Sequence, residues 1–133
     1  MDQNKKTVSQ ELDRLEQKYA VTFPPALREL YLRETAAPFR PFTFFVGGYE
    51  CGVAKLIPPV ADGLSFETIV DGDRADGFLP QSYFPLARDR GGNLYYWDSR
   101  TGKVFFVLND DIEDPFLVFP TVSDFVRCVD EHQ

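Results

Sequence analysis

The sequence contains few of the residue types that enzymes use for chemistry. Its 133 residues include one histidine, His132, next to the last position, and two cysteines. Residues so close to a chain end are usually mobile, and a cysteine nucleophile needs a base beside its thiol. Cys51 and Cys128 have no such partner in the sequence apart from that histidine. We therefore expect a protein without catalytic residues, which is not an enzyme.

Motifs for cofactors and metal ions are missing as well. The glycine pairs at 47–48 and 91–92 are not followed by the Lys-Ser or Lys-Thr of a phosphate-binding loop, and no G-x-S-x-G segment occurs. Asp71 to Gly77 resembles the start of a calcium-binding loop, but its third aspartate and its glycine come one position late, and Ser82 stands where glutamate belongs. We expect a polar loop here, with no metal and no cofactor.

Long apolar runs are also lacking. No segment approaches the ~20 apolar residues of a membrane span, and the first residues have no apolar signal core. The two cysteines have no metal-like spacing, so we interpret them as reduced, buried residues of a cytoplasmic protein, with a disulfide between them as the alternative.

Positive charge is scarce relative to negative charge. There are 14 Lys and Arg residues against 21 Asp and Glu residues, which gives a net charge of −7. A direct nucleic-acid interface is usually basic and is therefore disfavoured. The acidity either keeps the protein soluble or suits a basic protein partner, and both interpretations stay open.

The candidate partner-binding residues lie in two expected acidic loops: Asp71, Asp73, Asp76, Asp110, Asp111, Glu113 and Asp114. Exposed aromatic residues are the next candidates: Tyr49, Tyr83 and Tyr95.

Aromatic residues are abundant, and the segment from residue 84 to 107 is rich in them. There are 13 Phe, 6 Tyr and 1 Trp residues in the chain. The apolar segment Phe84–Ala87 leads through a turn into Leu94–Asp98, and a second turn leads into Lys103–Val107. Aromatic and β-branched residues favour strands, so this pattern predicts two adjacent hairpins.

The two turns contain residues that suit tight backbone geometry. Gly91, Gly92, Asn93 and Gly102 tolerate the positive φ that such turns need. Asp89 and Asp98 form a pair of carboxylates of the kind used in hydrolysis, but each can instead accept hydrogen bonds from the backbone of its own turn. We interpret all six as structural turn residues.

Periodicity predicts the remaining elements. Helices are expected over Val8–Tyr19, Ala26–Arg33 and a C-terminal segment capped by Thr121, and Ser65–Val70 favours a short helix over a strand. Strands are expected over Phe42–Val46, Val53–Ile57 and Phe116–Phe119. Together these predict one α+β domain over residues 1–133, with a mainly antiparallel sheet and helices packed on one side.

Several segments, in this order, resemble a known family: Phe23-Pro24-Pro25-Ala26-Leu27, Phe84-Pro85-Leu86-Ala87-Arg88-Asp89, Gly91-Gly92-Asn93, Trp97-Asp98, Gly102-Lys103-Val104 and Val122-Ser123-Asp124-Phe125-Val126. The chain is similar to the SUKH superfamily, which includes the yeast Smi/Knr-type cell-wall regulators and many bacterial immunity proteins. The resemblance covers nearly the whole chain, and its most specific part is the stretch from Ala87 to Val104. It departs after the second expected helix, where members often carry Asn-Gly and this chain has Glu34 to Pro38.

The resemblance implies an α+β fold without catalytic residues. In bacteria it implies a cytoplasmic immunity protein that binds and neutralises a cognate toxin, commonly a nuclease and, for this acidic chain, a basic one. The alternative is a regulatory interaction module of the Smi/Knr type. No membrane or nucleic-acid partner is implied, and no partner surface is carried over to the segment after the second helix.

Overall fold

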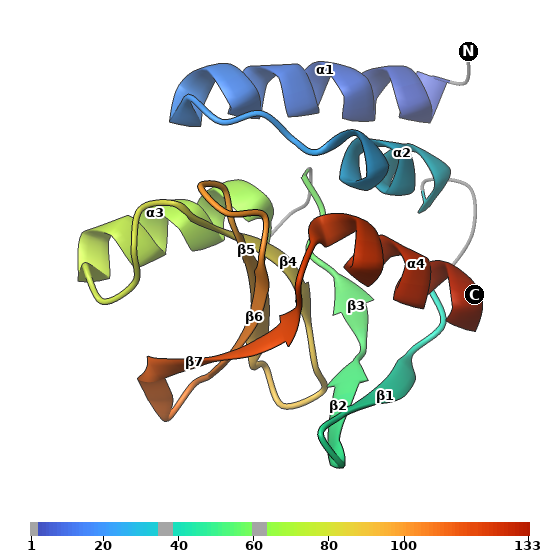
Figure 1. Ribbon diagram of the computed structural model, residues 1–133. Coiled ribbons are helices and arrows are strands. Elements are labelled where there is room, and N and C mark those ends of the chain that lie inside the picture. The colour runs from blue at the N-terminus through green and yellow to red at the C-terminus, as the bar shows by residue number, and fades with distance from the viewer. Residues whose placement is uncertain (1–2, 35–38, 60–63) are drawn as a thin grey trace.

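The computed structural model describes residues 3–34, 39–59 and 64–133 of the chain (Figure 1). The elements follow in this order: α1 (Gln3–Tyr19), α2 (Pro25–Glu34), β1 (Phe42–Val46), β2 (Tyr49–Val53), β3 (Lys55–Leu56), α3 (Phe66–Asp76), β4 (Tyr83–Arg88), β5 (Leu94–Asp98), β6 (Val104–Leu108), β7 (Asp111–Phe119) and α4 (Val122–His132). Residues 35–38, where the family resemblance departs, lie outside the described residues.

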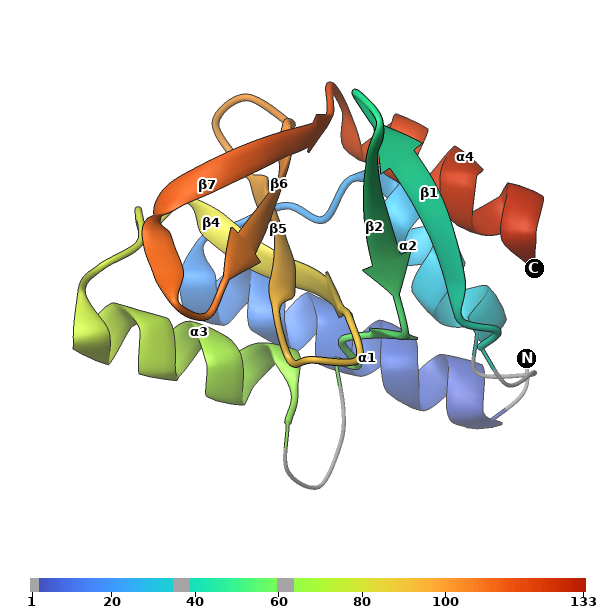
Figure 2. The same ribbon diagram turned by 90° about the horizontal axis from the view of Figure 1, so that it is seen from below.

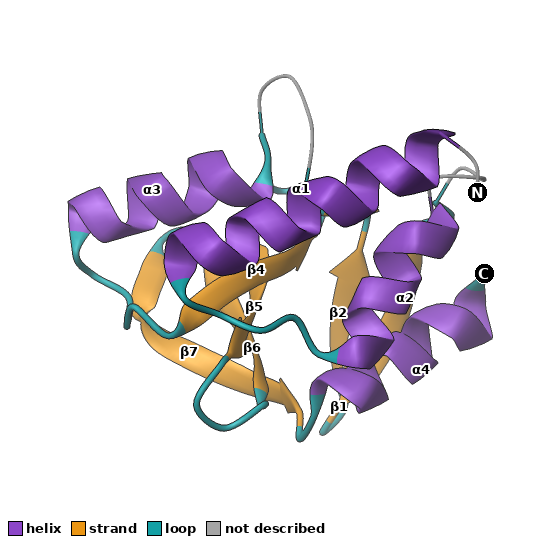
Figure 3. Ribbon diagram, turned by 90° about the horizontal axis from the view of Figure 1, so that it is seen from above, coloured by secondary structure: helices purple, strands orange, loops and turns teal. Residues whose placement is uncertain are grey.

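The strands form two antiparallel sheets. One has five strands in the order β3-β4-β5-β6-β7, and the other is the β1–β2 hairpin. Figure 2 shows the β1–β2 hairpin beside the larger sheet, with β1 next to α4. Figure 3 shows α1 and α2 lying over the strands, with α3 and α4 on either side. The predicted α+β fold is therefore confirmed.

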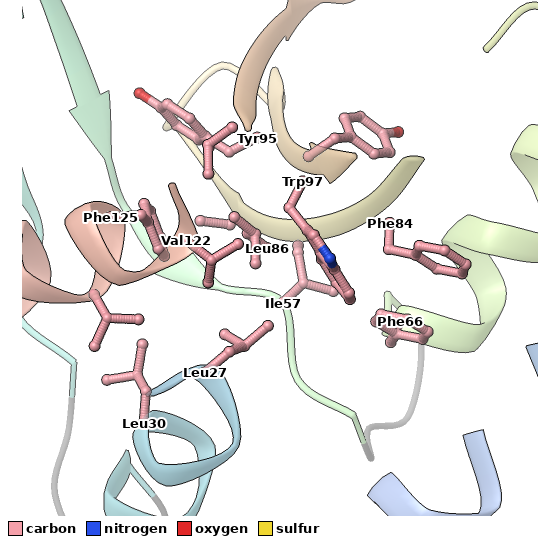
Figure 4. Close-up of a cluster of buried hydrophobic side chains, with 14 of the residues drawn as sticks. Leu27, Leu30, Ile57, Phe66, Phe84, Leu86, Tyr95, Trp97, Val122 and Phe125 are labelled. Carbon is pink, nitrogen blue, oxygen red and sulfur yellow. The ribbon is translucent and has the colours of Figure 1, made fainter. Parts of the chain in front are cut away.

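An aromatic cluster forms the centre of the core (Figure 4). The Trp97 side chain is 1% exposed, and its ring centroid lies 5.2 Å from that of Phe84 and 5.8 Å from that of Phe23. Trp97 and Phe84 are cross-strand partners, so both point to the same face of the sheet. That face is covered by the first turn of α3 through Phe66 and by Leu27 of α2. Large rings therefore join the sheet to its helices.

α3 is longer than the sequence predicts. Ser65 caps its first turn in a reciprocal pair with Thr68, and the helix ends only at Gly77, whose φ is 75°. Asp71, Asp73 and Asp76 are thus helical, and the expected loop over 71–77 is wrong. Contacts from elsewhere in the chain stabilise the added turns, because Asp71 pairs with Lys18 of α1 and accepts a hydrogen bond from the Tyr19 hydroxyl.

β7 begins at Asp111 rather than at Phe116, so the expected acidic loop over 109–115 is wrong too. Leu108 of β6 pairs with Asp111, and Phe106 pairs with Phe116. Between these two pairs β6 has one residue and β7 has four, so the segment 112–115 forms a bulge. The acidic residues of this segment are part of an irregularly paired strand.

Side-chain hydrogen bonds hold the two turns on either side of β5. The Asp89 carboxylate accepts hydrogen bonds from the backbone amide of Asn93 at 2.8 Å and from its side-chain amide at 2.9 Å. The buried Asp98 carboxylate accepts from the Arg100 amide at 3.0 Å. Gly92 and Gly102 have positive φ, at 85° and 79°. Gly91 and Asn93 do not, so their expected need for positive φ is wrong.

Replacing Gly92 with alanine should lower the free energy of unfolding by more than about 1 kcal/mol, because a side chain strains the backbone at its φ of 85°. An added Cβ would lie 3.5 Å from Asn109 Nδ2, an ordinary contact, so the loss comes from the backbone. Urea unfolding of the variant and the wild type measures the loss. Gly91→Ala is the matched control, since it adds the same atom without positive φ; equal loss in both variants would contradict this account of the turn.

The cysteines are both free thiols, with Cys51 buried and Cys128 half-buried. Each therefore carries a thiol rather than a disulfide in this structure. Only Cys51 is fully inside the core.

Over the described ranges of the chain, no helix combines the length and the apolar content needed to cross a membrane.

Candidate functional site

Four of the predicted partner-binding residues lie together on the hairpin formed by β6 and β7. We call this the acidic hairpin, and its residues are Asp110, Asp111, Glu113 and Asp114, all exposed. Within the described part of the chain, none of the four belongs to an ion pair. No lysine or arginine occurs between Lys103 and Arg127. The hairpin lies on the side of the molecule away from α1 and α2 (Figure 1).

The other three predicted residues lie on α3 and differ among themselves. Asp71 faces α1, with its carboxylate 2.7 Å from the Tyr19 hydroxyl and 3.3 Å from Lys18 Nζ. It therefore serves the packing of two helices. Asp73 accepts a hydrogen bond from the Tyr96 hydroxyl at 2.8 Å, and burial raises the pKa of its carboxyl, with the nearby charge of Asp76 adding to the effect. Asp76 itself is exposed.

A groove joins the end of α3 to the base of the acidic hairpin. It has a volume of about 270 Å³. Its lining comes from α3, the segment after it and strands β5 to β7: Asp73, Asp76, Phe78, Leu79, Leu94, Tyr96, Val107, Asn109 and Ile112. The structure thus brings Asp73 and Asp76 toward the acidic hairpin, and it leaves Asp71 apart.

A smaller hollow lies beside the acidic hairpin, next to the β1–β2 hairpin. We call it the notch; its volume is about 160 Å³. Its lining combines apolar side chains with two carboxylates: Tyr49, Phe106, Leu108, Asp111, Asp114 and Phe116. The Tyr49 and Phe116 ring centroids are 5.8 Å apart in an edge-on arrangement. The side chains of Tyr49 and Phe116 are 57% and 39% exposed, so apolar surface lies directly beside negative charge.

The aromatic candidates from the sequence have different outcomes. Tyr49 is exposed at the notch. Tyr95 is fully buried, and its hydroxyl donates a hydrogen bond to the Gly52 carbonyl at 2.7 Å, so its proposed exposure is wrong. Tyr83 is half-buried and stacked on Phe105, with ring centroids 5.4 Å apart. Sequence reasoning missed Phe116, and the only signal for it is the acidic run just before it.

The chain's histidine lies elsewhere, on α4. Its ring stacks on that of Phe42, with centroids 4.4 Å apart, and its Nδ1 lies 2.7 Å from the Cys128 carbonyl oxygen and 4.0 Å from Cys128 Sγ. Burial raises the pKa of the Cys128 thiol, which favours the protonated form rather than a reactive thiolate. Among the described residues, no group of three or more His, Cys, Asp or Glu side chains is placed to hold a metal ion.

The surface around the acidic hairpin therefore offers negative charge, exposed rings and two hollows, a combination suited to recognising a cationic protein surface.

In comparisons with known proteins, the model of the SMI1/KNR4 family (SUKH-1) matches residues 8–128. The match runs from the first half of α1 into α4. No curated protein and no solved structure matches the chain.

Proposed function

Because this chain belongs to the SMI1/KNR4 family (SUKH-1), we propose that it is a cytoplasmic, non-enzymatic immunity protein that binds and neutralises a cognate toxin. The proposed partner is a basic protein, and a nuclease is the class that fits best. A nuclease binds a polyanion, so its active site presents positive charge. An acidic protein can dock on that charge and block the site without any catalytic step of its own.

The observation that carries this proposal is the acidic hairpin. Its four carboxylates have no ion-pair partner in the described parts of the chain, unlike Glu67 and Asp71 of α3, which pair with residues of α1. Exposed charges without local partners contribute little to folding. They do contribute a long-range attraction that speeds association with an oppositely charged protein.

A regulatory interaction module is the second candidate. The observation that favours it is the matching family model itself, which carries the SMI1/KNR4 description. The same docking surface would serve both roles, and the two candidates differ in the effect that binding has on the partner. An immunity protein abolishes the activity of its partner, whereas a regulatory module leaves a functional complex.

The test is a rescue experiment with any basic toxin whose gene lies beside the gene for this chain. We expect that toxin to stop growth of a bacterial host when expressed alone, and co-expression of this chain to restore growth. Isothermal titration calorimetry on the two purified proteins should then give a one-to-one complex whose affinity falls as salt is added. A tight complex that leaves the toxin active would favour the regulatory role, and the absence of binding would refute the immunity role.

A further inference from the structure

The notch combines the two kinds of group that attract a guanidinium. Tyr49 and Phe116 present ring surface to solvent, and a cation placed over such a ring is attracted by its negative face. Asp111 and Asp114, which also line the notch, supply acceptors for charged hydrogen bonds. Tyr49 comes from the β1–β2 hairpin, whereas Phe116 and both carboxylates come from β7, so the packing of the two sheets brings the second ring to the site.

The size and charge of the notch limit what can fill it. Its volume of about 160 Å³ is well below the ~300–1,000 Å³ of pockets that hold whole small molecules, so it suits one side chain. The residues lining the notch include no lysine or arginine, so the described chain supplies no cation of its own there. The two carboxylates are exposed and have no ion-pair partner among the described residues. Among the described residues, no charge complements this hollow, so it is open to a cation from a partner.

We infer that the notch receives the side chain of one arginine from the basic partner. The inference rests on the proposed function for the nature of that partner. In this arrangement the guanidinium lies against the rings of Tyr49 and Phe116, and its N–H groups donate to Asp111 and Asp114. Arginine fits better than lysine because its planar, weakly hydrated head group both stacks on rings and presents several donors in one plane. Its aliphatic stem would cover apolar lining of the notch such as Leu108.

The test uses a free arginine derivative, so it does not depend on knowing the toxin. N-acetyl-arginine methylamide is titrated into the full, isotope-labelled chain and followed by NMR. We expect shifts in the ring signals of Tyr49 and Phe116 and in the amides of Asp111 and Asp114. The uncharged norleucine derivative should bind at least about fivefold more weakly, and the lysine derivative should rank between the two. Equal binding of the norleucine and arginine derivatives would overturn the inference, and a lysine derivative that binds as tightly would overturn the choice of arginine.

Two variants separate the notch from the rest of the hairpin. Tyr49→Leu keeps an apolar side chain but removes a ring, and it should weaken binding of the arginine derivative about fivefold. Phe45→Leu is the matched control. Phe45 is 66% exposed but pairs with Glu50, whereas Tyr49 pairs with Val46, so the two rings lie on opposite faces of the β1–β2 hairpin. An equal effect of both variants would overturn the assignment of the site to the notch.

Calorimetry with the toxin distinguishes failure of this inference from failure of the proposed function. If the arginine derivative does not bind while the toxin still binds in a salt-dependent manner, the notch assignment is wrong and the immunity role stands. If the derivative binds at the notch while the toxin does not bind, the arginine site stands and the proposed partner is wrong.

Discussion

A variant with lysine at Asp110, Asp111, Glu113 and Asp114 should associate with a basic partner about a hundred times more slowly than the wild type at low ionic strength. The four changes remove four negative charges and add four positive charges, so the net charge of −7 becomes +1. They also replace the local attraction at the acidic hairpin with repulsion. The fold should persist, since all four side chains are exposed and none belongs to an ion pair among the described residues. Stopped-flow mixing with the toxin identified by the rescue experiment measures the rate.

A matched pair of variants tests whether position matters beyond total charge. Asp111→Lys with Asp114→Lys changes the net charge by the same amount as Glu29→Lys with Glu131→Lys, which alters exposed residues on α2 and α4. We expect the first pair to slow association much more than the second, and the difference to shrink as salt is added. Equal rates for the two pairs would mean that only net charge steers the encounter, and the acidic hairpin would lose its role as the docking surface.

Replacing Trp97 with alanine should lower the free energy of unfolding by ~3–5 kcal/mol. Its ring is 1% exposed and lies among the rings of Phe23, Phe66 and Phe84, so the change leaves a large cavity where the sheet meets its helices. Domains of this size usually have a free energy of unfolding of only about 5–15 kcal/mol, so the substitution would remove a large part of it. Urea unfolding followed by far-ultraviolet circular dichroism measures the loss.

The control for this variant is Phe45→Ala, which removes a ring of similar character from the surface. Phe45 is 66% exposed, and we expect its loss to change the free energy of unfolding by less than ~0.5 kcal/mol. A Trp97 variant as stable as the Phe45 variant would show that the aromatic cluster does not hold the sheet and helices together.

The sequence predicts the two hairpins around β5 well because their turns are local. The bonds of Asp89 to Asn93 and of Asp98 to Arg100 join residues a few positions apart, and the glycines supply the backbone freedom. Helix ends marked by a capping residue are predicted for the same reason. Thr121 accepts from the Asp124 amide at 3.1 Å, as its place in the sequence indicates.

The sequence predicts α3 and β7 less well because their extensions depend on distant residues. The segment after Val70 is rich in aspartate and has a poor helix propensity, but Lys18 and Tyr19 of α1 and Tyr96 of β5 bind its carboxylates. The acidic start of β7, with Pro115, has a low strand propensity, and its pairing with β6 is interrupted by the bulge. The notch lies beyond sequence reasoning altogether, because Tyr49 and Phe116 meet only when the two sheets pack.

β7 is the last strand of the five-stranded sheet and pairs with β6 alone. An open strand edge can recruit another copy of the same protein and start a fibre. Here the edge carries like charges that repel their equivalents on a second molecule, and Pro115 lacks an amide hydrogen with which to pair. The residues proposed to attract a cationic protein would therefore also repel identical molecules, so the same charges would favour a partner over a second copy.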